Sequence, residues 1–378
     1  MATSDITMKP LGMRVKVLQV FRFVFASIFK IFCTLYYGKS GENFPPITAD
    51  ILKLPAVEVA NKIRNKEIKT EFIVNANAWL WETHNHIYGR TNNPYNTTRI
   101  VGGSSGGEGC IQGAAGSIFG VGLGPMTRHA VDLKPLLKIM SGDNASKLDL
   151  DKNVDVGKLK VFYQLSSNAP MTDSVDPEIT TALKKVVEFF SVKYKVEAEE
   201  KKFQFLQKSL PIWMTTMKNK EPFERLIMGK EGTTAIVLEI FKSLIGCSGN
   251  TLIGLFTALM DGAGAEIGSD KYNYHLKLRD DLEKIFVEML GDDGVFLYPT
   301  HPTTAPYHNE PLVKPFNFSY TAVINCLGLP ATTVPLGLSS EGLPIGIQVV
   351  ANHNNDRLCL AVAEELDKAF GGWVEPRH

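Results

Sequence analysis

One glycine- and serine-rich loop restricts the fold and chemistry of this chain more than any other feature. It lies within residues 101–110 and contains two serines between two pairs of glycines: Gly102, Gly103, Ser104, Ser105, Gly106 and Gly107. Glycine has no Cβ, so such a backbone can adopt positive φ and approach a reacting group closely. Small residues follow at 110–116 and predict a helix, whose first N–H groups would point at the serines.

Other interpretations of the loop fit less well. A phosphate-binding loop needs a lysine at its end, but Glu108 stands where a cation would be required. A dinucleotide-binding fingerprint fails because Gly107 and Gly109 are followed by Gln112 instead of a third glycine. A flexible linker is the remaining alternative. The apolar residues before the loop and the small-residue helix after it favour a functional site held between rigid elements.

Charge and cysteine content exclude several classes of protein. The 378 residues include 40 basic and 40 acidic side chains, so nothing favours a nucleic-acid partner. The five cysteines are widely spaced and form no CxxC pair. This pattern indicates reduced thiols and predicts neither a zinc site nor a disulfide framework. We expect no metal and no organic cofactor.

The N-terminal segment is strongly apolar from Val15 to Tyr37. Arg22 and Lys30 interrupt it, and the longest uninterrupted run, 23–29, is shorter than the roughly 20 residues of a clear span. Both cations could reach the interface from a tilted or in-plane helix. Residues 1–40 are therefore predicted to anchor the chain to a membrane, an intracellular one in preference to secretion. A buried core helix is the alternative, and a signal peptide is disfavoured because no small-residue cleavage site follows.

Residues 41–378 predict an α/β domain. Helices are expected at 55–63, 176–190, 275–290 and 356–370, and strands at 159–163, 295–298, 331–335 and 344–350. Strands interleaved with helices predict a layered sheet flanked by helices. The apolar stretch Leu244–Met260 contains three glycines and fits either a bent, membrane-facing helical pair or a buried helix broken by a turn.

Ordered sequence matches give the chain a family resemblance. The loop Gly102–Gly109 resembles the signature loop of the amidase signature family of serine hydrolases, and in particular its fatty-acid amide hydrolase group. The likeness continues through residues 87–95, 124–128, 291–299, 314–318, 328–330, 342–350 and 370–374. The resemblance implies a mixed sheet flanked by helices and hydrolysis of an amide bond without a cofactor.

In that family a neutral lysine takes a proton through a bridging serine, and so activates a second serine to attack the carbonyl. By its place in the motif, Ser104 resembles the bridging serine. Ser105 is its neighbour, and the glycines Gly102, Gly103, Gly106 and Gly107 would support the loop geometry.

Two parts of the family pattern are missing from this sequence. The attacking serine belongs to a Gly-Gly-Ser-Ile-Arg type segment, but here Gly120-Val121-Gly122 leads directly to Leu123-Gly124-Pro125. The base belongs to a Pro-x-x-Val-Lys segment, and no lysine stands between Lys69 and Ser104. Lys66 and Lys69 fit solvated helix charges. We therefore predict internal deletions near 70–77 and 122–124, which would also make the sheet incomplete.

The resemblance implies hydrolysis of fatty acid amides to a fatty acid and an amine, but the missing segments predict little or no activity. Two alternatives stay open: a non-catalytic lipid-binding or interaction protein, and a chain that folds incompletely. Membrane lipid or a fatty acid amide is the expected partner, and a homodimer is compatible with the sequence.

Three minor signals are interpreted as structural. His301 and His308 lie in a loop without carboxylates at ligand spacing. The Asp292-Asp293-Gly294 run fits a turn between a helix and a strand. Asn96 begins a glycosylation sequon that matters only if the domain faces a secretory lumen.

Overall fold

The computed structural model describes residues 13–38, 53–55, 57–58, 82–85, 89–115, 117, 119–121, 124–218, 225, 232–262 and 264–376. Both predicted deletion points lie wholly or partly outside this part of the chain. The same is true of most of the helix expected at 55–63 and of the two lysines that precede the serine loop.

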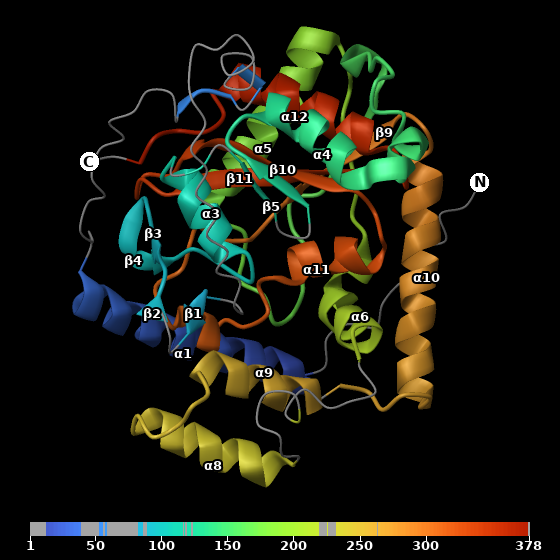
Figure 1. Ribbon diagram of the computed structural model, residues 1–378. Helices are drawn as coiled ribbons and strands as arrows, with labels where there is room; N and C mark the ends of the chain where they lie inside the picture. Colours follow the sequence, from blue (N-terminus) through green and yellow to red (C-terminus); the bar gives the residue numbers. More distant parts are fainter. Residues whose placement is uncertain are drawn as a thin grey trace.

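A five-stranded mixed sheet forms the centre of the domain (Figure 1). Its strand order is β10-β11-β9-β7-β8, with β10 and β11 antiparallel, β11 and β9 antiparallel, and β7 parallel to both β9 and β8. The strands are β7 (Lys160–Tyr163), β8 (Glu199–Glu200), β9 (Gly294–Pro299), β10 (Ala331–Leu338) and β11 (Pro344–Ala351). The predicted fold class, a mixed sheet flanked by helices, is thus confirmed.

Side chains of β9 alternate between two apolar layers. Val295 and Leu297 join one buried cluster with α5 (Pro177–Phe189) and α12 (Asp356–Phe370). Phe296 and Tyr298 join another with α10 (Asp270–Leu290), α11 (Ser319–Cys326) and α6 (Ser209–Thr216). Successive residues of a strand face opposite sides of a sheet, so this central strand is covered on both sides.

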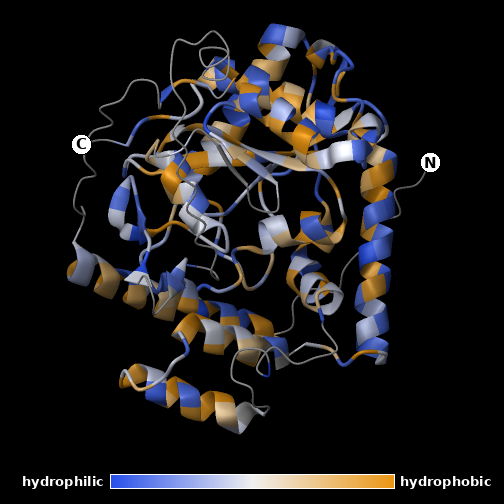
Figure 2. Ribbon diagram, viewed as in Figure 1, coloured by the Kyte–Doolittle hydropathy of each residue, from blue (hydrophilic) through white to orange (hydrophobic). Residues whose placement is uncertain are grey.

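The flanking helices follow their sequence signals. Asp176 caps α5 by accepting a hydrogen bond from the backbone N–H of Glu178, and Pro177 occupies the first turn. Ser269 caps α10 through the N–H of Tyr272, so this helix begins five residues before the predicted start at 275. Figure 2 shows hydrophobic and hydrophilic residues alternating around α10, as expected of a helix with one buried face.

Smaller elements surround the sheet. The hairpins are β1 (His84–Asn85) with β2 (Gly89–Arg90), β3 (Asn92–Asn93) with β4 (Asn96–Ile100), and β5 (Phe119–Val121) with β6 (Pro125–Thr127). Other α-helices in the described part of the chain include α3 (Gly106–Gly113), α4 (Leu133–Ser141), α8 (Thr233–Leu244), α9 (Leu252–Gly262) and the N-terminal α1 (Met13–Tyr37).

The apolar stretch 244–260 contains a helix break. It comprises the last residue of α8, a turn and most of α9, and these two helices pack on each other through Ile236, Leu255 and Ala258. Figure 1 places α1, α9 and α8 at one end of the molecule, below the sheet and its covering helices. The stretch therefore includes a turn between two packed helices, and the expectation that this pair faces a membrane stays a prediction.

The double-sided burial of β9 makes Phe296 a sensitive position. Its side chain is fully buried between the rings of Phe286, at 5.2 Å, and Tyr298, at 5.4 Å. We expect Phe296→Ala to lower the free energy of unfolding by about 3–5 kcal/mol, because it removes a large apolar side chain and leaves a cavity. Urea unfolding would measure the loss. Val192→Ala, at a side chain that is 65% exposed, serves as the control and should change stability little.

Candidate active site

The serine loop connects β4 to α3. On its β4 side, the Ile100 N–H donates to the carbonyl of Pro306 over 3.0 Å. The backbones of Arg99 and Tyr307 form an isolated antiparallel β-bridge. The guanidinium of Arg99 also lies 3.7 Å from the centre of the Tyr307 ring. The segment that follows β9 therefore holds the entrance to the loop.

The two candidate serines lie at the N-terminal end of α3. The Gly103–Ser104 peptide bond is cis, and the Ser104 side chain is exposed. Ser105 precedes the helix, is half-buried, and accepts a hydrogen bond at its carbonyl from Gly109 N–H over 3.1 Å. Gly102 adopts φ +82°, a conformation that favours glycine. Ser104 thus reaches solvent beside the first N–H groups of a short helix.

Thr83, which the sequence analysis did not single out, fastens this loop. Its hydroxyl donates to the carbonyl of Gly102 over 2.9 Å, and its own carbonyl accepts from Thr91 N–H over 3.1 Å. Gly106 is buried directly against it: a Cβ at that position would lie 2.2 Å from Thr83 Oγ1. The loop therefore needs glycine at 106 because the threonine occupies the space.

Next to Thr83, Glu82 is a buried carboxylate. Its Oε1 accepts from the backbone N–H of Asn309 over 2.8 Å, while Arg90 Nε stays 3.8 Å from Oε2. Arg90 also donates to Asn309 Oδ1 over 2.9 Å. Burial raises the pKa of Glu82 to about 7, and the Arg90 charge and the Asn309 hydrogen bond only partly oppose it. No sequence motif marks this residue.

Neither serine hydroxyl has a hydrogen-bond partner within the described part of the chain. No described lysine therefore bonds to Ser104 or Ser105. Lys66 and Lys69 lie outside the described residues. Of the glycines predicted to support the loop, Gly102 and Gly103 precede Ser104, and Gly106 and Gly107 are buried at the start of α3.

The other candidates form local contacts. His301 Nδ1 lies 2.8 Å from the carbonyl of Thr303, and His308 Nε2 lies 3.0 Å from that of Thr97. Burial lowers the pKa of both histidines, that of His308 to about 4. No cluster of metal ligands occurs among the described residues, and all five cysteines, which lie within them, are free thiols. Asn96 Oδ1 accepts from the N–H of Thr98 within its own turn.

Comparison with known proteins identifies the family of the chain that contains this serine loop. A family model described as Amidase matches residues 74–123 and 122–360, which is well over half of the chain. The chain belongs to the amidase family. The resemblance inferred from the signature loop and from the later segments is thereby confirmed.

Among known amidases, the chain is similar to fatty-acid amide hydrolases. It is 40% identical to fatty-acid amide hydrolase 2-B of Danio rerio and 38% identical to fatty-acid amide hydrolase 2 of Homo sapiens. Each alignment covers 79% of this chain and 66% of the relative. The chain thus spans about two thirds of the length of these relatives.

Solved structures share the fold at low sequence identity. A 6-aminohexanoate cyclic dimer hydrolase, solved in complex with its substrate, matches with a TM-score of 0.56 and 19% identity, over 80% of this chain and 74% of that chain. A fatty acid amide hydrolase matches with a TM-score of 0.54 and 18% identity, over 80% and 65%. These similarities show that the amidase fold is present.

The contact between Thr83 and Gly106 leads to a paired prediction within α3. Gly106→Ala places a methyl group 2.2 Å from Thr83 Oγ1 and 2.8 Å from Val101 Cγ2, so we expect a loss of about 1–3 kcal/mol in unfolding free energy. Gly109→Ala meets nothing within 4 Å, and should stabilise by about 0.5–1 kcal/mol through helix propensity. Chemical denaturation of both variants measures the difference. Equal stability of the two would contradict the proposed packing of Thr83 under the loop.

The buried carboxylate of Glu82 predicts a pH dependence of stability. Its pKa lies above the ordinary value of 4.5, so between about pH 4.5 and 7 the folded state binds a proton that the unfolded state has released. The stability contributed by this group is therefore present at low pH and is lost as the pH rises through 7. Glu82→Gln keeps an acceptor for Asn309 but does not titrate. We expect it to be more stable than the parent at pH 8, by up to about 3 kcal/mol, and similar at pH 5.

Thermal unfolding across pH 5–8 checks this expectation. Glu288→Gln, at an exposed position on α10, is the matched control and should follow the parent profile. If Glu82→Gln also follows the parent profile at every pH, Glu82 does not titrate in this range in the folded protein.

Proposed function

We propose that this amidase is a membrane-associated relative of the fatty-acid amide hydrolase group that has little or no hydrolytic turnover. The observation that carries the proposal is a serine loop retained in full while its chemical partners are missing from the sequence. No lysine stands between Lys69 and Ser104, and no Gly-Gly-Ser-Ile-Arg type segment follows Gly122.

The chemistry explains why the loop is insufficient by itself. A serine hydroxyl is a weak nucleophile until a neighbouring base takes its proton. The charge that develops on the carbonyl oxygen also needs fixed donors, and a single donor contributes about 3 kcal/mol. The exposed Ser104 has neither a base nor a second serine bonded to it among the described residues. Residues of a catalytic unit act together, so the loss of any of them lowers the rate by several orders of magnitude.

The alignments support internal deletions. The alignment with the Danio rerio relative extends over 349 residues, but 79% of this chain is only about 299 of its 378 residues. About 50 aligned positions of the relative therefore have no counterpart here, since 349 exceeds 299 by 50. The family match also begins at residue 74 and divides at 122–123, close to the two predicted deletions.

The proposed ligand class is a fatty acid amide. Two relatives named for this activity support it, and so do the exposed apolar side chains of α1 and α8. A chain with these features and without turnover would act as a lipid-binding or interaction protein. The hydrophobic α1 supports membrane association because its 23 residues Val15–Tyr37 are long and apolar enough to cross a bilayer, with a mean hydropathy of 1.7 in the most apolar window of 18 residues.

A fluorophosphonate probe tests the proposed loss of activity. We expect no labelling of the purified chain at probe concentrations that label human fatty-acid amide hydrolase 2 completely, and hydrolysis of a long-chain fatty acid amide at least several orders of magnitude slower. Titration with a non-hydrolysable fatty acid amide should still detect binding. Labelling that disappears in Ser104→Ala and persists in Ser105→Ala would overturn the proposal and identify Ser104 as a working nucleophile.

A further inference from the structure

Helix α1 lies against the domain along one continuous stripe. Arg22, Ala26, Cys33 and Tyr37 are spaced by four, seven and four residues, which places them on one face of a helix. Ala26 and Cys33 are buried, at 3% and 2% exposure. Figure 1 shows the helix running below the sheet and its covering helices, with α9 and α8 lower still.

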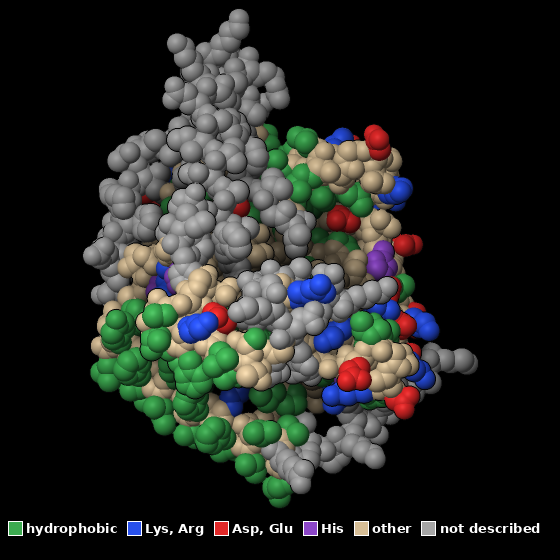
Figure 3. All heavy atoms as spheres, turned by 60° about the horizontal axis from the view of Figure 1, so that its bottom comes forward, with side chains coloured by type: hydrophobic (Ala, Val, Ile, Leu, Met, Phe, Trp, Pro, Cys, Tyr) green, Lys and Arg blue, Asp and Glu red, His purple; other side chains and the backbone are tan. Residues whose placement is uncertain are grey.

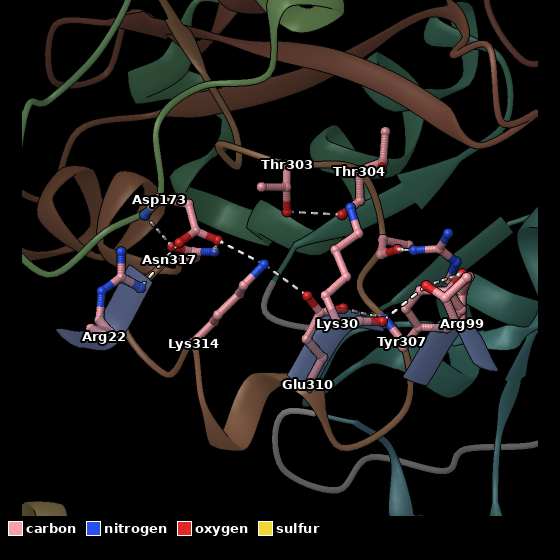
Figure 4. Close-up of polar contacts among 12 residues, drawn as sticks. Arg22, Lys30, Arg99, Asp173, Thr303, Thr304, Tyr307, Glu310, Lys314 and Asn317 are labelled. Carbon is pink, nitrogen blue, oxygen red and sulfur yellow. Dashed lines mark hydrogen bonds and ion pairs between the residues drawn. The ribbon is translucent and has the colours of Figure 1, made fainter. Parts of the chain in front are cut away.

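An ion-pair cluster holds this stripe near the N-terminal half of the helix (Figure 4). Arg22 Nη1 lies 3.0 Å from Asp173 Oδ1, and Arg22 Nη2 donates to the carbonyl of Thr172 over 2.8 Å. Lys314 lies 3.3 Å from the other oxygen of Asp173 and 2.7 Å from Glu310. Arg22 and Asp173 are only 14% and 16% exposed. Burial alone would raise the pKa of Asp173, but Lys314, Asn317 and Arg22 together hold it below its ordinary value.

A second set of contacts fixes the C-terminal end of α1. The Tyr37 ring stacks on Tyr307 at 6.1 Å, and Asn309 Nδ2 donates to the Tyr37 hydroxyl over 3.3 Å. Thr34 Oγ1 donates to the Tyr307 hydroxyl over 3.4 Å. Since Arg22 and Tyr37 are separated by about 22 Å along a helix that rises 1.5 Å per residue, the helix is bound to the domain at two distant points.

The opposite face of α1 is apolar and exposed. Thirteen large hydrophobic side chains are at least 50% exposed there, and Figure 3 shows hydrophobic side chains gathered in a band at this end of the molecule. They are Met13, Val17, Leu18, Val20, Phe21, Phe23, Val24, Phe25, Ile28, Ile31, Phe32, Leu35 and Tyr36. Besides Arg22, which is paired with Asp173, the sequence of the helix contains three basic residues and no acidic one, which complements anionic headgroups.

These contacts distinguish two orientations of an apolar helix in a membrane. The candidate span Val15–Tyr37 is centred on Ala26, so a spanning orientation would place Arg22 and Lys30 four residues on either side of the centre, in the hydrocarbon. It would also require the contacts of Arg22 and Tyr37 with the domain to break. In an in-plane orientation, Arg22 keeps its ion pair and the thirteen apolar side chains enter one leaflet.

We propose that α1 lies in the plane of a single leaflet of an anionic phospholipid bilayer, held there by the clamp of Arg22 on Asp173 and of Tyr37 on Tyr307, and does not cross the membrane. This inference rests on the proposed membrane association but not on the absence of turnover. It implies that the N-terminus and the amidase domain lie on the same side of the bilayer.

The test uses the full chain with one epitope tag at each terminus, synthesised in the presence of sealed microsomes. Proteinase K is added to intact vesicles, and to detergent-opened vesicles as the digestion control. We expect the two tags to share one fate in intact vesicles, both removed or both protected. One tag protected and the other removed would overturn the in-plane orientation.

Variants separate the clamp from general hydrophobicity. Arg22→Leu combined with Lys30→Leu removes the Arg22 half of the clamp and both central charges, and we expect most molecules to place their tags on opposite sides. Lys16→Leu, at an exposed position of the same helix, raises hydropathy without touching the clamp and should leave the tags on one side. If the double variant and Lys16→Leu behave alike, Arg22 does not set the orientation.

Flotation of the purified chain with phosphatidylcholine vesicles containing phosphatidylserine tests the proposed membrane association separately from the in-plane orientation of α1. We expect co-flotation that weakens at high salt. A chain that remains in solution, as a monomer or as a dimer with α1 covered by a second copy, would overturn both the membrane association and the in-plane helix. Co-flotation with tags on opposite sides would overturn the in-plane helix alone.

Discussion

Burial of β9 on both faces is the constraint on which the described domain depends. Val295 and Leu297 pack against α5 and α12, and Phe296 and Tyr298 pack against α10 and α11. This one strand therefore joins the two halves of the core. The segment that leaves this strand runs directly to the serine loop, because Pro306 accepts the backbone N–H of Ile100. The position of the loop therefore depends on a strand almost two hundred residues further along the chain.

Local signals in the sequence predicted the helices α5, α10 and α12 and the strands β7, β9, β10 and β11. The elements α4, α6, α11 and β8 and the contacts between distant segments were not predicted. Asp176-Pro177 identified the start of α5 because a cap and a proline act within one turn. The start of α10 was predicted too late, since the periodic apolar residues begin after its cap at Ser269. Glu82 carries no local signal: its environment comes from Asn309, 227 residues away, and only the folded chain brings the two together.

In the candidate site, the residues that hold the serine loop in place differ from the residues that would carry out amide hydrolysis. The groups that hold the loop are Thr83, Gly106 and the hydrogen bonds of β4, and none of them takes part in proton transfer in the family's reaction as the resemblance implies it. Removal of a base or a nucleophile encoded elsewhere in the sequence leaves these packing contacts in place. The contacts that hold the signature loop are therefore separate from the groups that carry the reaction, and the signature alone predicts fold more securely than turnover.

The segment 306–314 connects this loop to the apolar helix. Tyr307 stacks on Tyr37 of α1 and receives the Arg99 guanidinium of β4, while Asn309 binds both Tyr37 and Glu82. A single stretch of backbone thus contacts the N-terminal helix and the residues beneath the serine loop. Because both sets of contacts are made by the same few side chains, the loop cannot change its distance from the apolar face of α1 without breaking one set. The orientation of α1 in a leaflet would therefore set the distance of Ser104 from the bilayer surface.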